Sequence, residues 1–173
     1  MMRQRKRNRK RGFDYSSAGI YFLTVCCKNR IHWLGQVNNH LMELNQYGAI
    51  VQQQIKWLPQ QYPYLTIHNF VVMPNHVHLL CEIVGPGRNV AGTGRNLSLP
   101  KIKSISELMG AFKTTSSKQI HLAGNVVFGW QRSFHDHIVR SSESYERIDA
   151  YITQNPAKWD DDQLNKPENQ NSG

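Results

Sequence analysis

The sequence predicts an α+β domain with the ferredoxin-like split βαβ plan, an antiparallel sheet that carries two helices on one face. Three observations predict it. Segments follow one another in the order strand, helix, strand, strand, helix, strand. The strand segments are rich in β-branched and aromatic residues, and the helix segments repeat apolar residues at steps of three and four. One further helix follows the last strand, and we expect it to approach the other face of the sheet.

The first half of the chain supplies three strands and one helix. Residues 19–27 (GIYFLTVCC) are apolar on both faces, as expected of a central strand. Residues 65–73 predict a second strand, and Pro74-Asn75 predicts a tight turn before a third strand that begins at His76. The helix lies between the first two strands, and we expect Pro59 to end it. Its apolar stripe consists of Leu41, Leu44, Gly48, Val51, Ile55 and Leu58.

The second half supplies two helices and the last strand. Ser104 and Glu107 have the spacing of a capping box at the start of the second helix. Residues 130–140 (WQRSFHDHIVR) predict the fourth strand, Ser141 caps the C-terminal helix, and Pro156 stops it. The apolar stripes are Ile105, Leu108, Met109, Phe112 and Ile120 in the second helix, and Tyr145, Ile148 and Ile152 in the C-terminal one.

The chain is long enough for one ordinary hydrophobic core, since it has 173 residues of which 39% are hydrophobic. We therefore expect a single domain over residues 17–159. Residues 1–16 predict a flexible basic arm, and residues 160–173 predict a polar, frayed tail. The Gly-rich residues 85–101 lack periodicity and predict a long surface loop.

The net charge of +9 predicts a polyanionic partner, with nucleic acid first and an anionic membrane surface second. No apolar run is long enough to cross a bilayer, and no hydrophobic signal segment follows the basic N-terminus. The three cysteines Cys26, Cys27 and Cys81 show no CxxC spacing, which favours structural thiols in a reducing compartment. We therefore expect a cytoplasmic, nucleoid-associated protein without a membrane partner.

The third strand carries a candidate metal site. Because side chains alternate along a strand, His76 and His78 share one face, and two imidazoles on one face can bind one metal ion. The pair alone is also compatible with ordinary strand histidines, because an isolated His-x-His has low specificity. His135 and His137 form a second such pair, for which a metal site, a structural role or a place near DNA are all possible. The other face of the third strand is uniformly apolar and must be buried: Val77, Leu79, Cys81 and Ile83.

The C-terminal helix offers partners for the first pair. Tyr151 and Asn155 are four residues apart and therefore stack on one side of the helix. Both lie at the margin of the apolar stripe. From this position they can face His76 and His78 across the sheet.

Four segments in this order resemble the single-tyrosine HUH transposases, most closely the REP-associated tyrosine transposases. They are residues 73–78 (MPNHVH), 111–113 (AFK), 130–137 (WQRSFHDH) and 151–156 (YITQNP). The resemblance covers residues 17–159. It implies that the strand histidines bind a divalent metal, Mg²⁺ or Mn²⁺, and that the helical tyrosine is the nucleophile. The residues it assigns are His76, His78 and Asn155 for the metal and Tyr151 for catalysis; Asn155 replaces the glutamine common in the insertion-sequence enzymes and matches the REP-associated branch.

The resemblance also implies an activity and a substrate. It implies a metal-dependent enzyme that nicks and rejoins single-stranded DNA through a 5′-phosphotyrosine intermediate, with hairpins such as REP palindromes as the target. Relatives of this kind act as monomers or as homodimers. We expect DNA contacts from the arm and from the matched segments, although a Trp at a strand entry is more often a core anchor. The candidates are Arg5, Lys6, Arg7, Arg9, Lys113, Trp130, Gln131, Arg132 and Arg140.

Two other functions fit the same residues. A ferredoxin-like sheet with a basic arm can bind nucleic acid without catalysis, although the exposed aromatic pairs of an RNA-recognition sheet are not visible in the sequence. Alternatively, His76 and His78 can hold a metal that activates water for hydrolysis. Only the tyrosine mechanism makes a covalent adduct between protein and DNA.

Overall fold

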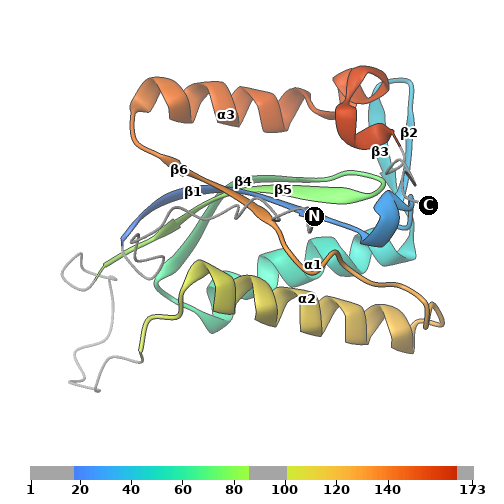
Figure 1. The fold of residues 1–173 in the computed structure, drawn as a ribbon, viewed down its shortest axis with the longest axis horizontal. Coiled ribbons are helices and arrows are strands. Elements are labelled where there is room, and N and C mark those ends of the chain that lie inside the picture. Colours follow the sequence, from blue (N-terminus) through green and yellow to red (C-terminus); the bar gives the residue numbers. More distant parts are fainter. Residues whose placement is uncertain (1–17, 86–100, 167–173) are drawn as a thin grey trace, which may run out of the picture.

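Four antiparallel strands form the central sheet, in the spatial order β4-β5-β1-β6 (Figure 1). The computed structural model describes residues 18–85 and 101–166, so the predicted basic arm lies outside the described residues. The strand order is that of the split βαβ plan, which confirms the predicted fold class. The strands are β1 (Gly19–Cys26), β4 (Leu65–Val72), β5 (His76–Ile83) and β6 (His135–Val139).

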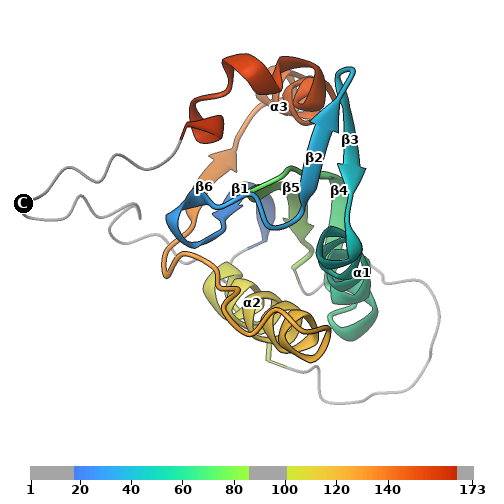
Figure 2. The same cartoon turned by 90° about the vertical axis from the view of Figure 1, so that its right-hand side faces the viewer.

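Helices cover both faces of this sheet. Helices α1 (Gln46–Gln61) and α2 (Ile105–Leu122) lie on one face, and α3 (Ser142–Gln154) lies on the other (Figures 1 and 2). Both predicted N-caps are present, because Ser104 forms a capping box with Glu107 and the Ser141 side chain accepts from the backbone N–H of Ser144. The arrangement of the helices is therefore the predicted one.

The core lies between the sheet and the α1–α2 layer. In β5 the uniformly apolar face predicted from the sequence is buried there, as are the odd-numbered side chains of β1. A second, smaller cluster lies under α3 and is built on Leu80, Val139, Ile148 and Ile152. The residues of β1 and β5 in the main core are Tyr21, Leu23, Val25, Val77, Leu79, Cys81 and Ile83.

Residues 35–44 form a hairpin that the sequence analysis assigned in part to a helix. Strands β2 (Gly35–Asn38) and β3 (Leu41–Leu44) pair with each other through a turn at Asn39 and His40, which both have positive φ. Such a two-residue turn matches the twist of a hairpin. The predicted stripe was therefore wrong at Leu41 and Leu44, whose three-residue spacing imitates a helix.

Helix α1 differs from the prediction at both of its ends. It begins after Asn45, whose side chain accepts hydrogen bonds from the N–H groups of Tyr47 and Gly48. A Cβ at Gly48 would lie 2.1 Å from the carbonyl oxygen of Leu34, so this start needs a glycine. Pro59 does not end the helix, which continues to Gln61. A proline lacks only its own backbone N–H, so the helix loses a single hydrogen bond near its end.

Strand β6 is shorter than predicted, since it begins at His135 rather than at Trp130. Trp130 makes only an isolated bridge to Cys27. The next residues turn their carbonyls to Lys113, whose Nζ donates to the oxygen of Gln131 at 2.8 Å. Those carbonyls are therefore not available for a continuous strand.

The C-terminal segment is ordered over a part that was predicted to be frayed. The 3-10 turns η2 (Pro156–Asp161) and η3 (Gln163–Asn165) follow α3 and lie beside the β2–β3 hairpin (Figure 2). Trp159 is only 6% exposed, and its ring packs against the rings of His32 and His76. This buried aromatic residue explains why the segment is held against the sheet.

Across residues 18–85 and 101–166, none of the helices is both long and apolar enough to span a membrane.

Candidate active site

The predicted histidine pair is buried at the start of β5. His76 is opposite Cys26 in β1 and His78 is opposite Thr24, so both point to the α3 side of the sheet. Their exposed fractions are 0% and 2%. Their Nε2 atoms lie 3.1 Å apart. Two imidazoles therefore converge on one point beneath α3.

Each histidine is oriented by a hydrogen bond at its other ring nitrogen. Nδ1 of His76 lies 2.8 Å from Oδ1 of Asn75, and Nδ1 of His78 lies 2.8 Å from the hydroxyl of Thr24. The amide oxygen of Asn75 can only accept, so Nδ1 of His76 carries the proton and its Nε2 offers a lone pair. Asn75 is itself held, because its Nδ2 donates to the carbonyl oxygens of Arg30 and Leu164. Such partners fix the tautomer and the direction of a metal ligand.

Burial keeps both imidazoles neutral. Loss of solvent, followed by the positive charge of Arg30, lowers the pKa of His76 to about 3, and a contact with Asn155 offsets part of this. The same loss of solvent, followed by the repulsion that two protonated rings would feel, holds the pKa of His78 well below its usual range. Neutral imidazole is the form that binds metal ions.

Helix α3 brings Tyr151 to this pair. The hydroxyl oxygen of Tyr151 lies 3.3 Å from Nε2 of His78, and 40% of the side chain remains exposed. The position follows from Ile148 and Ile152, which pack on the sheet and turn Tyr151 to the edge of the contact. Partial burial and the negative charge of Asp162 raise the pKa of Tyr151, whereas a hydrogen-bonding contact with Asn155 lowers it. Tyr151 is therefore protonated at neutral pH and reachable from solvent.

Asn155 and Asp162 complete the cluster. Asn155 is 2% exposed, and its Oδ1 is buried without a hydrogen bond, whereas its Nδ2 lies 3.4 Å from Oδ2 of Asp162. Ligand atoms of His76, His78 and Asp162 all lie within 4.8 Å of one another. Asp162 was missed by the sequence analysis, which placed it in a frayed tail. The one signal in the sequence is Trp159, an aromatic residue in an otherwise polar segment.

This donor set fits a divalent cation. Two neutral imidazole nitrogens face each other, and a carboxylate and an unpaired amide oxygen lie beside them. A buried acceptor without a donor is costly, and a cation would satisfy it. Mixed nitrogen and oxygen ligands of this kind suit divalent metals of intermediate hardness.

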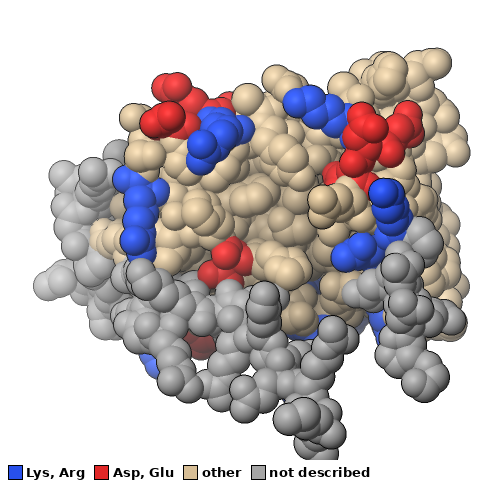
Figure 3. Space-filling view, turned by 45° about the horizontal axis from the view of Figure 1, so that its top comes forward, with Lys and Arg blue, Asp and Glu red and all other residues tan. Residues whose placement is uncertain are grey.

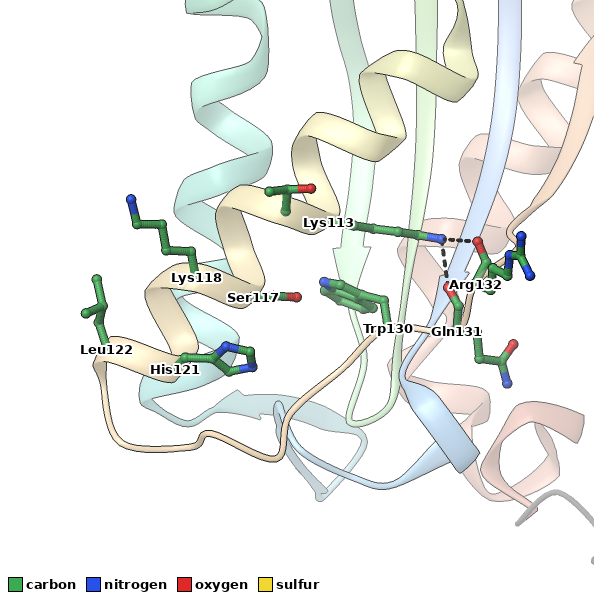
Figure 4. Close-up of a pocket in the computed structure, with 9 residues that line it drawn as sticks. Lys113, Ser117, Lys118, His121, Leu122, Trp130, Gln131 and Arg132 are labelled. Atoms are coloured by element: carbon green, nitrogen blue, oxygen red, sulfur yellow. Dashed lines mark hydrogen bonds between the residues drawn. The ribbon is translucent and has the colours of Figure 1, made fainter.

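Four predicted DNA contacts lie together on the other side of the sheet. Lys113, Trp130, Gln131 and Arg132 line a hollow of about 640 Å³ beside α2, which Figure 4 shows with Lys118 and Leu122 at the end far from Arg132.

Two of these residues have structural partners. Trp130 packs on Phe112 and Phe128, and its Nε1 donates to the hydroxyl of Ser116. The Lys113 ammonium donates to three carbonyls of residues 131–133. Trp130 is thus a core anchor and Lys113 a brace for the loop, which leaves Arg132, exposed, as the basic group at this end.

The remaining predicted contacts are not brought to the hollow. Arg140 follows the far end of β6, and Arg5, Lys6, Arg7 and Arg9 lie outside the described residues. On the surface in Figure 3, Lys and Arg side chains of the described residues are scattered beside acidic ones, and most of that surface is uncharged. The sequence shows where the net charge of +9 is concentrated: the first eleven residues hold seven of the 21 Lys and Arg residues and no acidic residue.

Comparison with known proteins adds three relatives, although no family model matches the chain. An uncharacterized protein of Haemophilus influenzae is 35% identical over 167 residues, which cover 92% of each chain. A second protein of that organism, assigned as a REP-associated tyrosine transposase, is 23% identical over 146 residues, covering 84% of this chain and 74% of the relative.

The third relative is a solved structure of a REP-associated tyrosine transposase bound to a REP hairpin. It superposes with a TM-score of 0.56 at 22% sequence identity, over 82% of this chain and 68% of that one. The two proteins therefore share the mixed fold of a four-stranded antiparallel sheet and packed helices.

Proposed function

The chain is a distant homologue of the REP-associated tyrosine transposases, and from this premise we propose that it nicks and rejoins single-stranded DNA. The observation that carries the proposal is the 3.3 Å distance between the hydroxyl of Tyr151 and Nε2 of His78. At this distance a solvent-accessible nucleophile lies directly beside a buried pair of side chains that can bind a metal ion. A domain that only binds DNA has no need of this arrangement.

The proposed reaction exchanges one ester bond for another. The hydroxyl oxygen of Tyr151 attacks a backbone phosphorus, the bond from phosphorus to the 3′ oxygen breaks, and the strand ends as a 5′-phosphotyrosine and a free 3′-hydroxyl. The phenolic proton passes to solvent, which reaches the partly exposed side chain, and solvent protonates the leaving oxygen. Because the ester energy is retained, a 3′-hydroxyl can attack the adduct and rejoin strands without ATP.

The metal site would consist of His76 and His78 with Asn155, Asp162 or both. A bound divalent ion, Mg²⁺ or Mn²⁺, would supply Lewis-acid stabilisation of the charge that develops on the phosphate. The chain's own contribution is orientation: Thr24 and Asn75 direct the two imidazoles at one point, and burial keeps both imidazoles neutral. Asn155 influences the pKa of both His76 and Tyr151.

We further propose that the substrate is a hairpin like the REP hairpin of the solved relative. The basic arm with Arg5, Lys6, Arg7 and Arg9 would bind backbone phosphates, since most of the net positive charge lies there. Arg132 would bind them at the α2 hollow, with Gln131 beside it and with Lys113 and Trp130 holding that segment in place. Arg140 is a separate contact at the other end of β6.

Covalent trapping tests the proposal. Labelled REP-like hairpins are incubated with the protein and Mg²⁺ or Mn²⁺, and denaturing gels report an adduct. We expect an adduct that is absent with Tyr151→Phe and with chelator. Tyr145→Phe, on the same helix but in the apolar stripe, is the matched control and should still form it. DNA binding without any adduct would favour the non-catalytic function, and cleavage that survives Tyr151→Phe would favour a metal-activated water.

A further inference from the structure

The sheet face that carries the histidines extends beyond α3. Helix α3 packs chiefly on β4 and β5, whereas β1 and β6 form the other half of the sheet. On β1, Phe22 and Thr24 lie on the histidine face, because they pair with Leu80 and His78 of β5. This face therefore continues from the metal-binding side chains toward the β6 edge.

Strand β6 adds two exposed imidazoles to this continuation. His135 is opposite Thr24, and His137 is opposite Phe22. Both histidines are exposed. Opposite side chains in an antiparallel pair have Cβ atoms about 5 Å apart. Phe22 and His137 are therefore cross-strand neighbours on the histidine face of the sheet.

Phe22 also touches the proposed catalytic groups. Its ring centroid lies 5.2 Å from that of His78 and 6.1 Å from that of Tyr151, to which it is edge-on. The side chain is half-buried and packs at the margin of the small cluster under α3. A ring at this position meets the nucleophile on one side and solvent on the other.

We propose that Phe22 and His137 form a platform on which unpaired bases of single-stranded DNA stack beside the cleaved phosphate. Flat rings next to a reactive site bind bases whose faces are free, and base pairs within a duplex are already stacked on each other. The occupant is therefore the unpaired strand that leads into Tyr151. This inference rests on the proposed function, which supplies the class of ligand. It adds two residues that bind the unpaired DNA, Phe22 and His137.

Comparison of two oligonucleotides tests the platform without cleavage. Fluorescence anisotropy measures binding of labelled oligothymidylate and of an abasic oligonucleotide of equal length, with the Tyr151→Phe protein and chelator present. The abasic strand keeps the phosphates and lacks the bases, so the difference in affinity reports stacking. We expect oligothymidylate to bind more tightly than the abasic strand.

Variants assign that difference to named rings. Phe22→Leu should lower the affinity for oligothymidylate at least about fivefold and leave the affinity for the abasic strand unchanged. Phe22→Trp should retain tight binding, and His137→Ala should lose part of the difference. His68→Ala is the matched control, since His68 is an exposed histidine on the opposite edge strand and contacts Glu82. The His68→Ala variant should bind both oligonucleotides as tightly as the parent protein does.

The outcomes separate this inference from the proposed function. Equal weakening of both oligonucleotides by Phe22→Leu, or no weakening of either, would overturn the platform, because a packing role or a charge effect does not distinguish bases from phosphates. If Phe22→Leu lowers the melting temperature, His137→Ala and Phe22→Trp decide the matter alone. A base-dependent loss with no covalent adduct on any hairpin would retain the platform and reject catalysis by Tyr151.

Discussion

Thr24 lies between the two histidine pairs of the chain, opposite His78 on one side and opposite His135 on the other. Its hydroxyl is 2.8 Å from Nδ1 of His78, and it is 8% exposed. A small hydroxyl residue in a central strand thus orients one imidazole and separates it from the exposed pair. In the proposed function His76 and His78 bind the metal ion, whereas His137 contacts the single-stranded DNA.

Thr24→Val should weaken metal binding by about 10–100-fold, because the hydroxyl that orients His78 is replaced by a methyl group of similar size. Titration with Mn²⁺ followed by electron paramagnetic resonance measures the affinity. Thr66→Val, at an exposed position of β4, is the control and should bind Mn²⁺ as the wild type does. Unchanged affinity in Thr24→Val would show that Thr24 does not orient the ligand.

The strands and helices were largely predictable because periodicity reports burial. The alternation in β5 identified both faces of that strand, and the capping box at Ser104 located the start of α2. The same reasoning failed at Leu41 and Leu44, since a short hairpin can repeat apolar residues at helical spacing. Spacing alone cannot distinguish the two, whereas the turn at Asn39 and His40 depends on backbone dihedral angles.

The candidate site was predictable where it depends on regular elements. His76, His78, Tyr151 and Asn155 lie together because strand and helix periods place them on facing surfaces. Asp162 was not predictable, because no periodic element carries it. Its segment is held by single contacts, such as Arg30 Nη1 to the carbonyl of Gln163 and Asn75 Nδ2 to the carbonyl of Leu164.

Asp162→Asn should lower the pKa of Tyr151 in the metal-free protein, because the carboxylate charge contributes to raising it. Tyrosinate absorbance is titrated, and the curve of the Tyr151→Phe protein is subtracted to isolate one residue. Asp160→Asn, an exposed neighbour in η2, should leave the pKa unchanged. If Asp162 is also a ligand, Asp162→Asn weakens Mn²⁺ binding as well; a variant that changes neither quantity contradicts both roles.

The metal-free protein should lose stability as the pH falls below about 6. The unfolded chain protonates histidine near pH 6.5, whereas burial lowers the pKa of His76 to about 3 in the folded protein. Between these values the unfolded state binds more protons, so the free energy of unfolding falls by up to about 1.4 kcal/mol per pH unit for such a histidine. Urea unfolding from pH 7 to pH 4 measures this.

The control for the pH experiment replaces the buried imidazole. His76→Gln should show a shallower dependence on pH than the wild type, because the amide that replaces the buried imidazole does not titrate. A wild-type stability that stays constant between pH 6 and pH 4 would contradict burial of neutral His76 and His78.

Removal of residues 1–11 should lower the salt dependence of DNA binding. Cleavage of the hairpin at saturating concentration should be retained. This segment holds seven of the 21 basic residues, and each phosphate contact contributes about 0.7 to the logarithmic salt slope for a single strand. The described residues that surround Tyr151 are unchanged by the deletion, so saturating hairpin should still yield the adduct. A shorter deletion of Met1 and Met2 removes no charge and serves as the control. If the salt slope of the longer deletion equals that of the control, phosphate contacts lie on the folded domain, and substitution of Arg132 and Arg140 by Gln becomes the next test.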